Sequence, residues 1–258
     1  MNYLKLFGIA AFAIGAILYL ASADDHKVVM GDQDYDLGEF VKISVNSSTD
    51  VEVYSGEDYA INVKADERDL KVLKIYVKGQ TLVIENKKDL FYSWKGDRPV
   101  ITVSLPLLKK FTLNGSADAQ ITGIHGRKFK VLLNGSGNIY FEGKSEELIA
   151  RVNGSGGLNG TSFDVAESDI EINGSGAATM AGKCDSLEIE VNGSGEFTGR
   201  DFKCKEVEVD IAGSGDLDVF ASEMLDVDVV GSGEVNVFGN PQQIKDRSRH
   251  KTHVTVRK

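Results

Sequence analysis

The chain has 258 residues, of which 29 are Lys or Arg and 39 are Asp or Glu, giving a formal net charge of −10 at pH 7. A body this acidic does not attract nucleic-acid phosphates through its general field, so that class of partner is excluded. The length suits one large domain or two small ones.

The N-terminus has the organisation of a secretory signal peptide, residues 1–23. Lys5 precedes an uncharged apolar run, Leu6 to Leu20, which is followed by Ala21-Ser22-Ala23 and two aspartates. This order predicts cleavage after Ala23, which would change the net charge from −10 to −11. The alternative is an uncleaved anchor, because residues 6–23 are nearly long enough to span a bilayer.

Residues 24–37 are interpreted as a linker and residues 38–108 as an irregular N-terminal cap. Six segments of the cap alternate apolar and polar residues, which is typical of strands with one buried face. They are Phe40–Val45, Val51–Tyr54, Ala60–Lys64, Leu73–Val77, Thr81–Glu85 and Val100–Leu105. Since no linker rich in Pro, Gly or Ser follows, we expect the cap to close the core of the repeats that come next.

A short motif, Asn-Gly-Ser-Gly or a close variant, recurs seven times in residues 109–239, with steps of 18 to 20 residues between its serines. A fixed period near 20 indicates a stack of identical supersecondary units. The serines are Ser116, Ser136, Ser155, Ser175, Ser194, Ser214 and Ser232.

The residues around each serine define the unit. Apolar residues stand three and five positions before almost every serine, and polar ones mostly stand between them. The alternation resumes after the serine, so each unit is predicted to contain a strand, a glycine-rich corner, a second strand and a return segment. The predicted fold is all-β: a parallel β-helix, or solenoid, of about seven coils of ~20 residues, with an irregular N-terminal β cap. Right-handed winding is expected for parallel crossovers.

Asparagine precedes the Gly-Ser pair in five of the seven units. In a eukaryotic secretory protein Asn-Gly-Ser would be a glycosylation acceptor, but here the corner repeat itself produces the triplet. Stacked asparagines and serines are therefore predicted to form structural ladders along the rod. A row of nucleophilic serines is discounted, because no His or Asp repeats at a fixed distance to act as a base. The asparagines are Asn114, Asn134, Asn153, Asn173 and Asn192.

The two cysteines, Cys184 and Cys204, each stand ten residues before a motif serine. Equivalent positions in adjacent coils place their Cα atoms about 5 Å apart, which suits a disulfide in an oxidising compartment. The alternative is a pair of reduced, buried thiols.

Charge is sorted along the positions four and six before each serine. The early coils carry Lys110, Lys130 and Arg151 there, whereas four later coils carry only carboxylates. Two interpretations remain open: a solvated face that keeps the protein soluble, or a surface for divalent cations or a basic partner. A flat face supplies few of the six to eight oxygens that calcium prefers. The carboxylates are Asp169, Glu171, Glu188, Glu190, Glu208, Asp210, Asp226 and Asp228.

The last residues, 246–258, are rich in Lys, Arg and His. The stretch His253–Arg257 has the alternation of a final strand, but a solvated basic tail is the preferred interpretation.

The order of the segments is as distinctive as the repeat. It reads FVKISVNSSTDVEVYSG, TLVIEN, VITVSLPLLKKFTLNGSA, the repeated NGSG coils and then VFGNPQQI. This order resembles the head GIN domain family of auto-transporter adhesins over roughly residues 38–245. The resemblance implies a bacterial envelope protein with a parallel β-helix similar in shape to pectate lyases, without their catalytic groups. The basic tail departs from the family pattern.

Three functions follow from these observations. The first is a non-catalytic protein of the periplasm or cell surface that presents a rigid surface for adhesion or assembly. The second is a polysaccharide-binding or lyase-like protein, and the third is a periplasmic scaffold tethered to the inner membrane. No cofactor, metal or catalytic residue is predicted, because no acid–base pair recurs and none of the four histidines lies in a repeating constellation. Nor do the 21 aromatic residues form a regular stacking platform. The expected partner is a protein or glycan surface, or a second copy of the chain.

Overall fold

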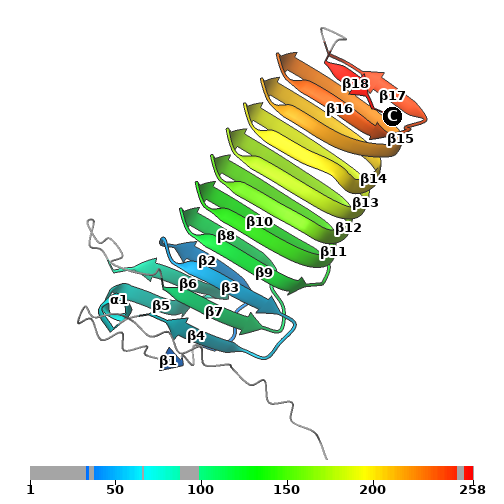
Figure 1. Cartoon of the computed structure of the whole chain (residues 1–258). Coiled ribbons are helices and arrows are strands. Elements are labelled where there is room, and N and C mark those ends of the chain that lie inside the picture. Colours follow the sequence, from blue (N-terminus) through cyan, green and yellow to red (C-terminus); the bar gives the residue numbers. More distant parts are fainter. Residues whose placement is uncertain (1–32, 35–37, 66, 88–98, 249–252, 258) are drawn as a thin grey trace, which may run out of the picture.

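Alternating side chains build one long β-solenoid, in which the coils stack along a rod (Figure 1). The computed structural model describes residues 33–34, 38–65, 67–87, 99–248 and 253–257. The predicted signal peptide and all of the predicted linker except residues 33–34 lie outside the described residues. In the part of the chain that is described, no helix has the length and apolar character needed to cross a bilayer.

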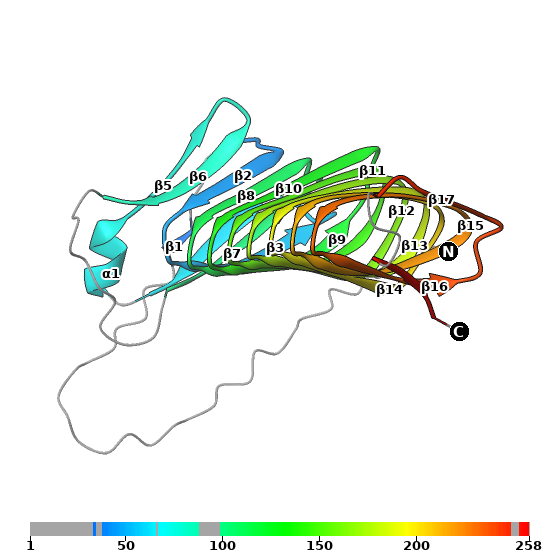
Figure 2. The same ribbon diagram turned by 90° about the horizontal axis from the view of Figure 1, so that it is seen from above.

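The cap contains short strands and one helix. Its elements are β1 (Gln33–Asp34), β2 (Lys42–Asn46), β3 (Asp50–Ser55), β4 (Ala60–Lys64), α1 (Glu67–Val72), β5 (Leu73–Lys78), β6 (Thr81–Asn86) and β7 (Val100–Leu105). All six predicted segments are strands, whereas α1 was not predicted. Figure 2 shows α1 and the β5–β6 hairpin extending beyond the coils.

The regular coils are built from short strands at first and then from strands that run through a whole coil. They are β8 (Lys110–Gly115), β9 (Asp118–Ile124), β10 (Lys128–Gly135), β11 (Asn138–Gly154), β12 (Gly157–Gly174), β13 (Ala177–Gly193), β14 (Glu196–Gly213), β15 (Asp216–Gly231) and β16 (Glu234–Gly239). Two further strands, β17 (Gln243–Asp246) and β18 (Val254–Val256), end the stack.

All strands belong to one hydrogen-bonded sheet that winds around the core, so two of its sides face each other and are here called the first and second sheets. The first sheet contains the strand segments that lead into each Gly-Ser corner, and the second sheet contains the segments that leave it. Every step between regular coils is parallel, with motif positions paired directly, such as Asn134 with Asn153 and Ile139 with Leu158. The return bend opposite the Gly-Ser corner, here called the second corner, lies within the long strands and carries the register shifts.

The core consists of the inward-facing columns of both sheets. The column five residues before the serines runs from Phe111 to Val227, and every member is at most 1% exposed. Each Val, Ile or Phe of this column contributes on the order of 1.5–3 kcal/mol by burial. Ser168 interrupts a neighbouring apolar column: it is 4% exposed, and its hydroxyl has no hydrogen-bond partner.

Glycine stands on both sides of the serine at every corner except the first, where Ala117 follows Ser116. Before Ser175, Gly174 has φ +119°, and a Cβ there would lie 2.6 Å from the carbonyl oxygen of Gly154 in the preceding coil. After it, a Cβ on Gly176 would lie 2.6 Å from Cγ1 of Val152. Backbone strain and close stacking together therefore explain why the motif recurs.

The cap contributes a coil whose place in the stack differs from its place in the chain. β2 pairs with β8 and β3 pairs with β9, so residues 42–55 form the coil next to the first regular one. On its other side β2 pairs with β6 and β3 with β7, again in parallel. The chain therefore leaves this coil after β3 and returns beyond it before continuing to β8.

The C-terminal residues also belong to the solenoid. β17 pairs with β15 in the first sheet, and β18 pairs with β16 in the second sheet. The preference for a solvated tail was therefore wrong for residues 246–248 and 253–257, whereas residues 249–252 and 258 lie outside the described part. Around β17 the physical reason is charge, because Lys245 and Arg247 reach carboxylates of the preceding coils. Residues 254–256 are held by backbone pairing with β16.

Candidate interaction surfaces

An asparagine ladder runs along the Gly-Ser corner. Each amide nitrogen donates to the side-chain oxygen of the asparagine in the preceding coil, at 2.7 Å for Asn134 to Asn114 and 3.2 Å for Asn192 to Asn173. The intermediate rungs, Asn153 to Asn134 and Asn173 to Asn153, measure 2.8 and 3.0 Å. The ladder fixes the register of the coils at this corner.

The ladder has a sixth member, Asn46 in the cap, which accepts from Asn114 at 2.6 Å. Sequence reasoning missed it, because Asn-Ser-Ser replaces Asn-Gly-Ser at this corner. The apolar alternation before Asn46 was the available signal. At the other end the ladder stops at Asn192, because Ala212 follows at that position in the next coil.

The seven serines stand in a column beside the asparagines, and all of them are exposed. The bonds that repeat at this position run through the backbone. The amide of Ser136 donates to the carbonyl of Gly115 at 3.0 Å, and that of Ser214 donates to Gly193 at 2.8 Å. The serine amides therefore extend the ladder of backbone hydrogen bonds around the corner.

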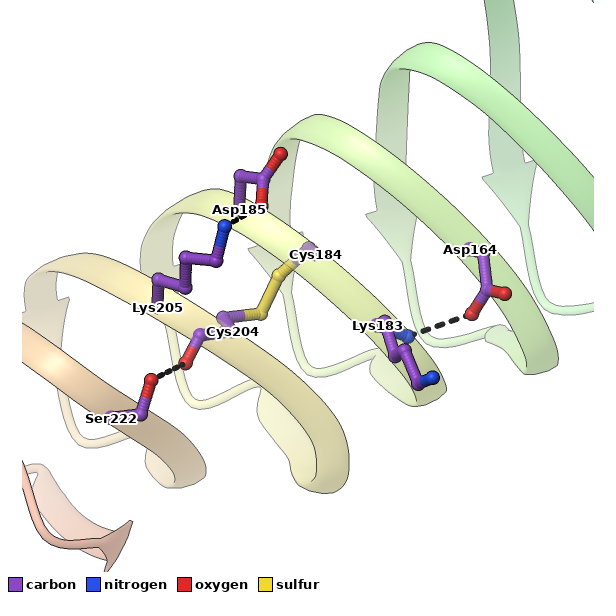
Figure 3. The surroundings of a disulfide bond; sticks show 7 residues. All are labelled: Asp164, Lys183, Cys184, Asp185, Cys204, Lys205 and Ser222. Atoms are coloured by element: carbon purple, nitrogen blue, oxygen red, sulfur yellow. Dashed lines mark hydrogen bonds and ion pairs between the residues drawn. A yellow bond between two sulfur atoms is a disulfide. The ribbon is translucent and has the colours of Figure 1, made fainter.

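The cysteines form a disulfide at the second corner, between β13 and β14 (Figure 3). Cys184 and Cys204 pair directly in the register, with their Cα atoms 4.5 Å apart, and both are buried. Since their separation is that of neighbouring strands, the bridge ties adjacent coils together without a change of register.

The eight predicted carboxylates form two columns on the first sheet, here called the acidic strip. Asp169, Glu188, Glu208 and Asp226 are paired in one column, and Glu171, Glu190, Asp210 and Asp228 in the other. The strip is joined to the asparagine ladder, because Asn173 donates to Glu171 at 2.6 Å and Asn192 donates to Glu190 at 2.8 Å.

The protein neutralises both ends of the strip with its own cations. At the N-terminal end, Arg151 contacts Asp169 and Glu171, both at 2.6 Å. At the C-terminal end, Arg247 lies 2.7 Å from Asp226 and 3.1 Å from Glu208, and Lys245 lies 2.8 Å from Asp226. The hydrogen bond to Asp169 and the surrounding carboxylates raise the pKa of Arg151.

Three carboxylates of the strip keep their negative charge without a cation. Within the described residues, Glu188, Glu190 and Asp228 have no cation at ion-pair distance. Burial and the neighbouring Asp169 and Glu208 raise the pKa of Glu188. Burial would likewise raise the pKa of Asp226, but the hydrogen bond from Lys245 and the charge of Arg247 outweigh it and lower that pKa.

The described residues contain no group of three or more His, Cys, Asp or Glu side chains arranged to hold a metal ion. The eight carboxylates stand along extended strands, so neighbouring pairs are separated by the strand spacing.

A basic groove follows the second corner, and sequence reasoning did not find it. A cavity of about 770 Å³ is lined there by five cations and three carboxylates. Two of the carboxylates are paired, Glu146 with Arg127 and Asp185 with Lys205. The five cations of the basic groove are Arg127, Lys144, Lys183, Lys203 and Lys205.

Two of these cations lack such a partner. Among the described residues, Lys144 and Lys183 have no carboxylate at ion-pair distance. The Asp164 carboxylate between them accepts the backbone amide of Lys183 at 3.0 Å (Figure 3). The groove was missed because its lysines stand on return segments, where the repeat shows no constant residue.

Similar folds are found among solved structures. A "putative adhesin" from Parabacteroides distasonis has a TM-score of 0.80 and 18% identity, covering 90% of this chain and 98% of its own. A "putative lipid binding protein" from Parabacteroides distasonis has a TM-score of 0.77 and 24% identity, with 88% and 96% covered. A "putative adhesin" from Parabacteroides merdae has a TM-score of 0.69 and 17% identity, with 89% and 96% covered. At these identities the likeness shows the fold.

The family assignment rests on the sequence of the solenoid. No curated protein shows detectable similarity to the chain. Residues 39–241, from the start of the cap to the end of the regular coils, match one family model. The chain therefore belongs to the family described as "putative auto-transporter adhesin, head GIN domain".

Proposed function

We propose that this protein is a non-catalytic component of the bacterial envelope whose rigid solenoid binds a partner surface in adhesion or assembly. The family description and the adhesin names of similar folds support an envelope role of this kind. The observation that carries the proposal is the acidic strip, in which Glu188, Glu190 and Asp228 have no cation at ion-pair distance among the described residues.

Rigidity makes this charge useful for binding. The strip residues are held at strand spacing because their strands pair with the coils on both sides, so little backbone freedom is lost when a partner docks. A partner with cations at the same spacing would relieve the repulsion between stacked carboxylates. The basic groove of a second copy offers such cations, because Lys144 and Lys183 are also uncompensated. We therefore propose salt-sensitive, side-by-side association between the strip of one copy and the groove of another.

The cations next to the acidic strip are not the ones proposed to bind a second copy. Arg151, Lys245 and Arg247 are engaged by the strip of their own chain and are not the cations offered to a partner. The groove cations take that role in the proposal.

The positions of the two carboxyl groups whose pKa is raised do not indicate a catalytic site. Glu188 and Asp210 stand on the exposed strip, and neither lines the cavity of the basic groove. A glycosidase or lyase would place such a group in a groove opposite a second acid or base. We infer a binding role for these carboxylates.

The proposed location is the periplasm or the cell surface, reached after cleavage behind Ala23. Intact mass of the protein recovered from the envelope tests this: a chain that begins at Asp24 supports secretion. A chain that retains Met1 favours the inner-membrane scaffold.

Light scattering of the purified protein at increasing salt tests the association. We expect the mass of the wild type to fall towards that of a monomer as salt rises, because exposed charges are screened over about 8 Å at physiological ionic strength. The triple variant Glu188→Gln, Glu190→Gln and Asp228→Asn should be monomeric throughout, and so should Lys144→Gln with Lys183→Gln.

A matched control removes three exposed carboxylates of the second sheet: Glu196→Gln, Asp216→Asn and Glu234→Gln. It changes the net charge equally and should associate like the wild type. A wild type that stays monomeric at every ionic strength would contradict the self-association, and so would equal behaviour of the two triple variants.

A further inference from the structure

Two exposed tyrosines lie near each other on the second sheet, although 86 positions separate them in the chain. Tyr54 is 41% exposed and Tyr140 is 48% exposed. β3 pairs with β9 and β9 with β11, in a register that places Tyr54 beside Thr122 and Tyr140 beside Gln120. The backbone positions of the two tyrosines are therefore two coils apart, about 10 Å along the rod, and two residues apart across it.

The surface beside Tyr140 is a shallow cavity of about 370 Å³. Amides flank the ring in the same column, Gln120 in the preceding coil and Asn159 in the following one. Thr122 and Thr161 add hydroxyls, and Glu142 adds one carboxylate. These polar groups and the two tyrosines together are here called the tyrosine platform. None of the residues that line this cavity is Lys, Arg or His.

We propose that the tyrosine platform binds a neutral glycan, with the sugar chain lying along the rod. A pyranose ring has an apolar face that stacks on an aromatic side chain and a rim of hydroxyls that need donors and acceptors. Tyrosine supplies the stacking surface at a low cost in side-chain entropy. Amides and hydroxyls supply both donors and acceptors, so they match the rim of the sugar.

Other ligand classes fit the platform less well. An anionic polymer would meet Glu52 and Glu142 without a cation in the cavity to pair with. An extended peptide could not add a strand here, because the platform is the face of a sheet whose backbone groups already bond to neighbouring coils. An apolar chain would have to cover polar side chains between the rings without replacing their hydrogen bonds to water.

The inference rests on the proposed role as a binding surface and names a ligand class for it. It uses the second sheet, whereas the acidic strip lies on the first sheet. Failure of one therefore does not imply failure of the other.

Isothermal titration with cellohexaose, mannohexaose and chitohexaose tests the proposal, with an oligogalacturonate of equal length as the acidic comparison. We expect at least one neutral hexamer to bind more tightly than the oligogalacturonate. Tyr140→Ala should weaken that binding about tenfold, which corresponds to about 1.4 kcal/mol, and Tyr54→Ala should weaken it less. Tyr140→Phe keeps the ring and should retain most of the affinity.

Thr179→Ala is a matched control in the same column, two coils beyond Tyr140. Its affinity for the hexamer and the melting temperatures of all variants should equal those of the wild type. All Tyr variants should keep the salt-dependent association, which separates this test from that of the acidic strip. No binding of any neutral hexamer at millimolar concentration would overturn the proposal, as would an unchanged affinity of Tyr140→Ala or a preference for the oligogalacturonate.

Discussion

The regular coils, residues 109–239, and the N-terminal cap, residues 38–108, share one core but are organised differently. In the regular coils, chain order and stack order coincide, and each corner repeats the same backbone geometry. In the cap, the coil formed by β2 and β3 lies between strands that come later in the chain. A sequence repeat therefore predicts where a residue lies in the stack only where consecutive units in the chain are also neighbours in the stack.

The corner glycines provide the strongest test of this difference. Gly174→Ala should destabilise the fold by about 3 kcal/mol or more, because a positive φ and a clash with the backbone of the preceding coil act together. Gly79→Ala in the cap should cost only about 1–2 kcal/mol, since Gly79 has φ +64° but nothing within 4 Å of an added Cβ. Urea denaturation of both variants measures the difference, and equal losses would show that stacking contributes nothing at the regular corner.

The asparagine ladder gives the next largest contrast. Asn173→Asp should cost on the order of 1–3 kcal/mol, because the Asn173 amide donates to Asn153 and Glu171 and the new carboxylate would face both. Asn46→Asp should be nearly neutral, because Asn46 at the cap end accepts from Asn114 and an aspartate still accepts. Melting temperatures of the two variants test this, and an unchanged value for Asn173→Asp would argue against a ladder that contributes to stability.

Buried hydroxyls interrupt the core in both regions. The hydroxyls of Ser168 in the regular coils and Thr49 in the cap are buried without a partner. Ser168→Ala and Thr49→Val should each stabilise the protein by about 1 kcal/mol, because the cost of the unsatisfied group is removed. Chemical denaturation measures both effects. A loss of stability in either variant would mean that the hydroxyl has a partner in solution.

Substitution of charged residues should produce the smallest change in melting temperature, and the sign of that change should differ between the two regions. Because the pKa of Glu188 is raised in the folded protein, this carboxyl group adds to the free energy of unfolding at pH values below its ordinary pKa of 4.5. That added stability is lost as the pH rises through the higher pKa of the folded state. Glu188→Gln should therefore raise the melting temperature slightly at pH 7 and not at pH 4.

The cap offers the matched comparison. Glu85 pairs with Lys74 at 2.9 Å, so Glu85→Gln should lower the melting temperature slightly at pH 7. Shifts of the same sign in the two variants at pH 7 would contradict the assignment of repulsion to the strip and attraction to the cap.

Much of the regular region could be predicted because its signals are local. Alternation around each serine located the strands, the spacing of the cysteines located adjacent coils, and the charges four and six residues before the serines located the acidic strip. The partners of the strip could not be predicted in the same way. Arg247 reaches Glu208 from 39 residues further along the chain, in a segment that lacks the motif.

The period, the buried face and the glycine corner could be read from the chain, because they depend on residues close together in it. The stacking of distant segments was needed to show that Asn46 joins the ladder, that Lys144 and Lys183 line one groove, and that Tyr54 lies two coils from Tyr140. The physical reason is that each coil packs its neighbours at a fixed spacing whatever the intervening chain length. Stacking order therefore decides which side chains share a surface. At the cap the chain order does not give the stacking order. At the second corner and the C-terminal end the two orders agree, but no repeated motif marks the positions that pair.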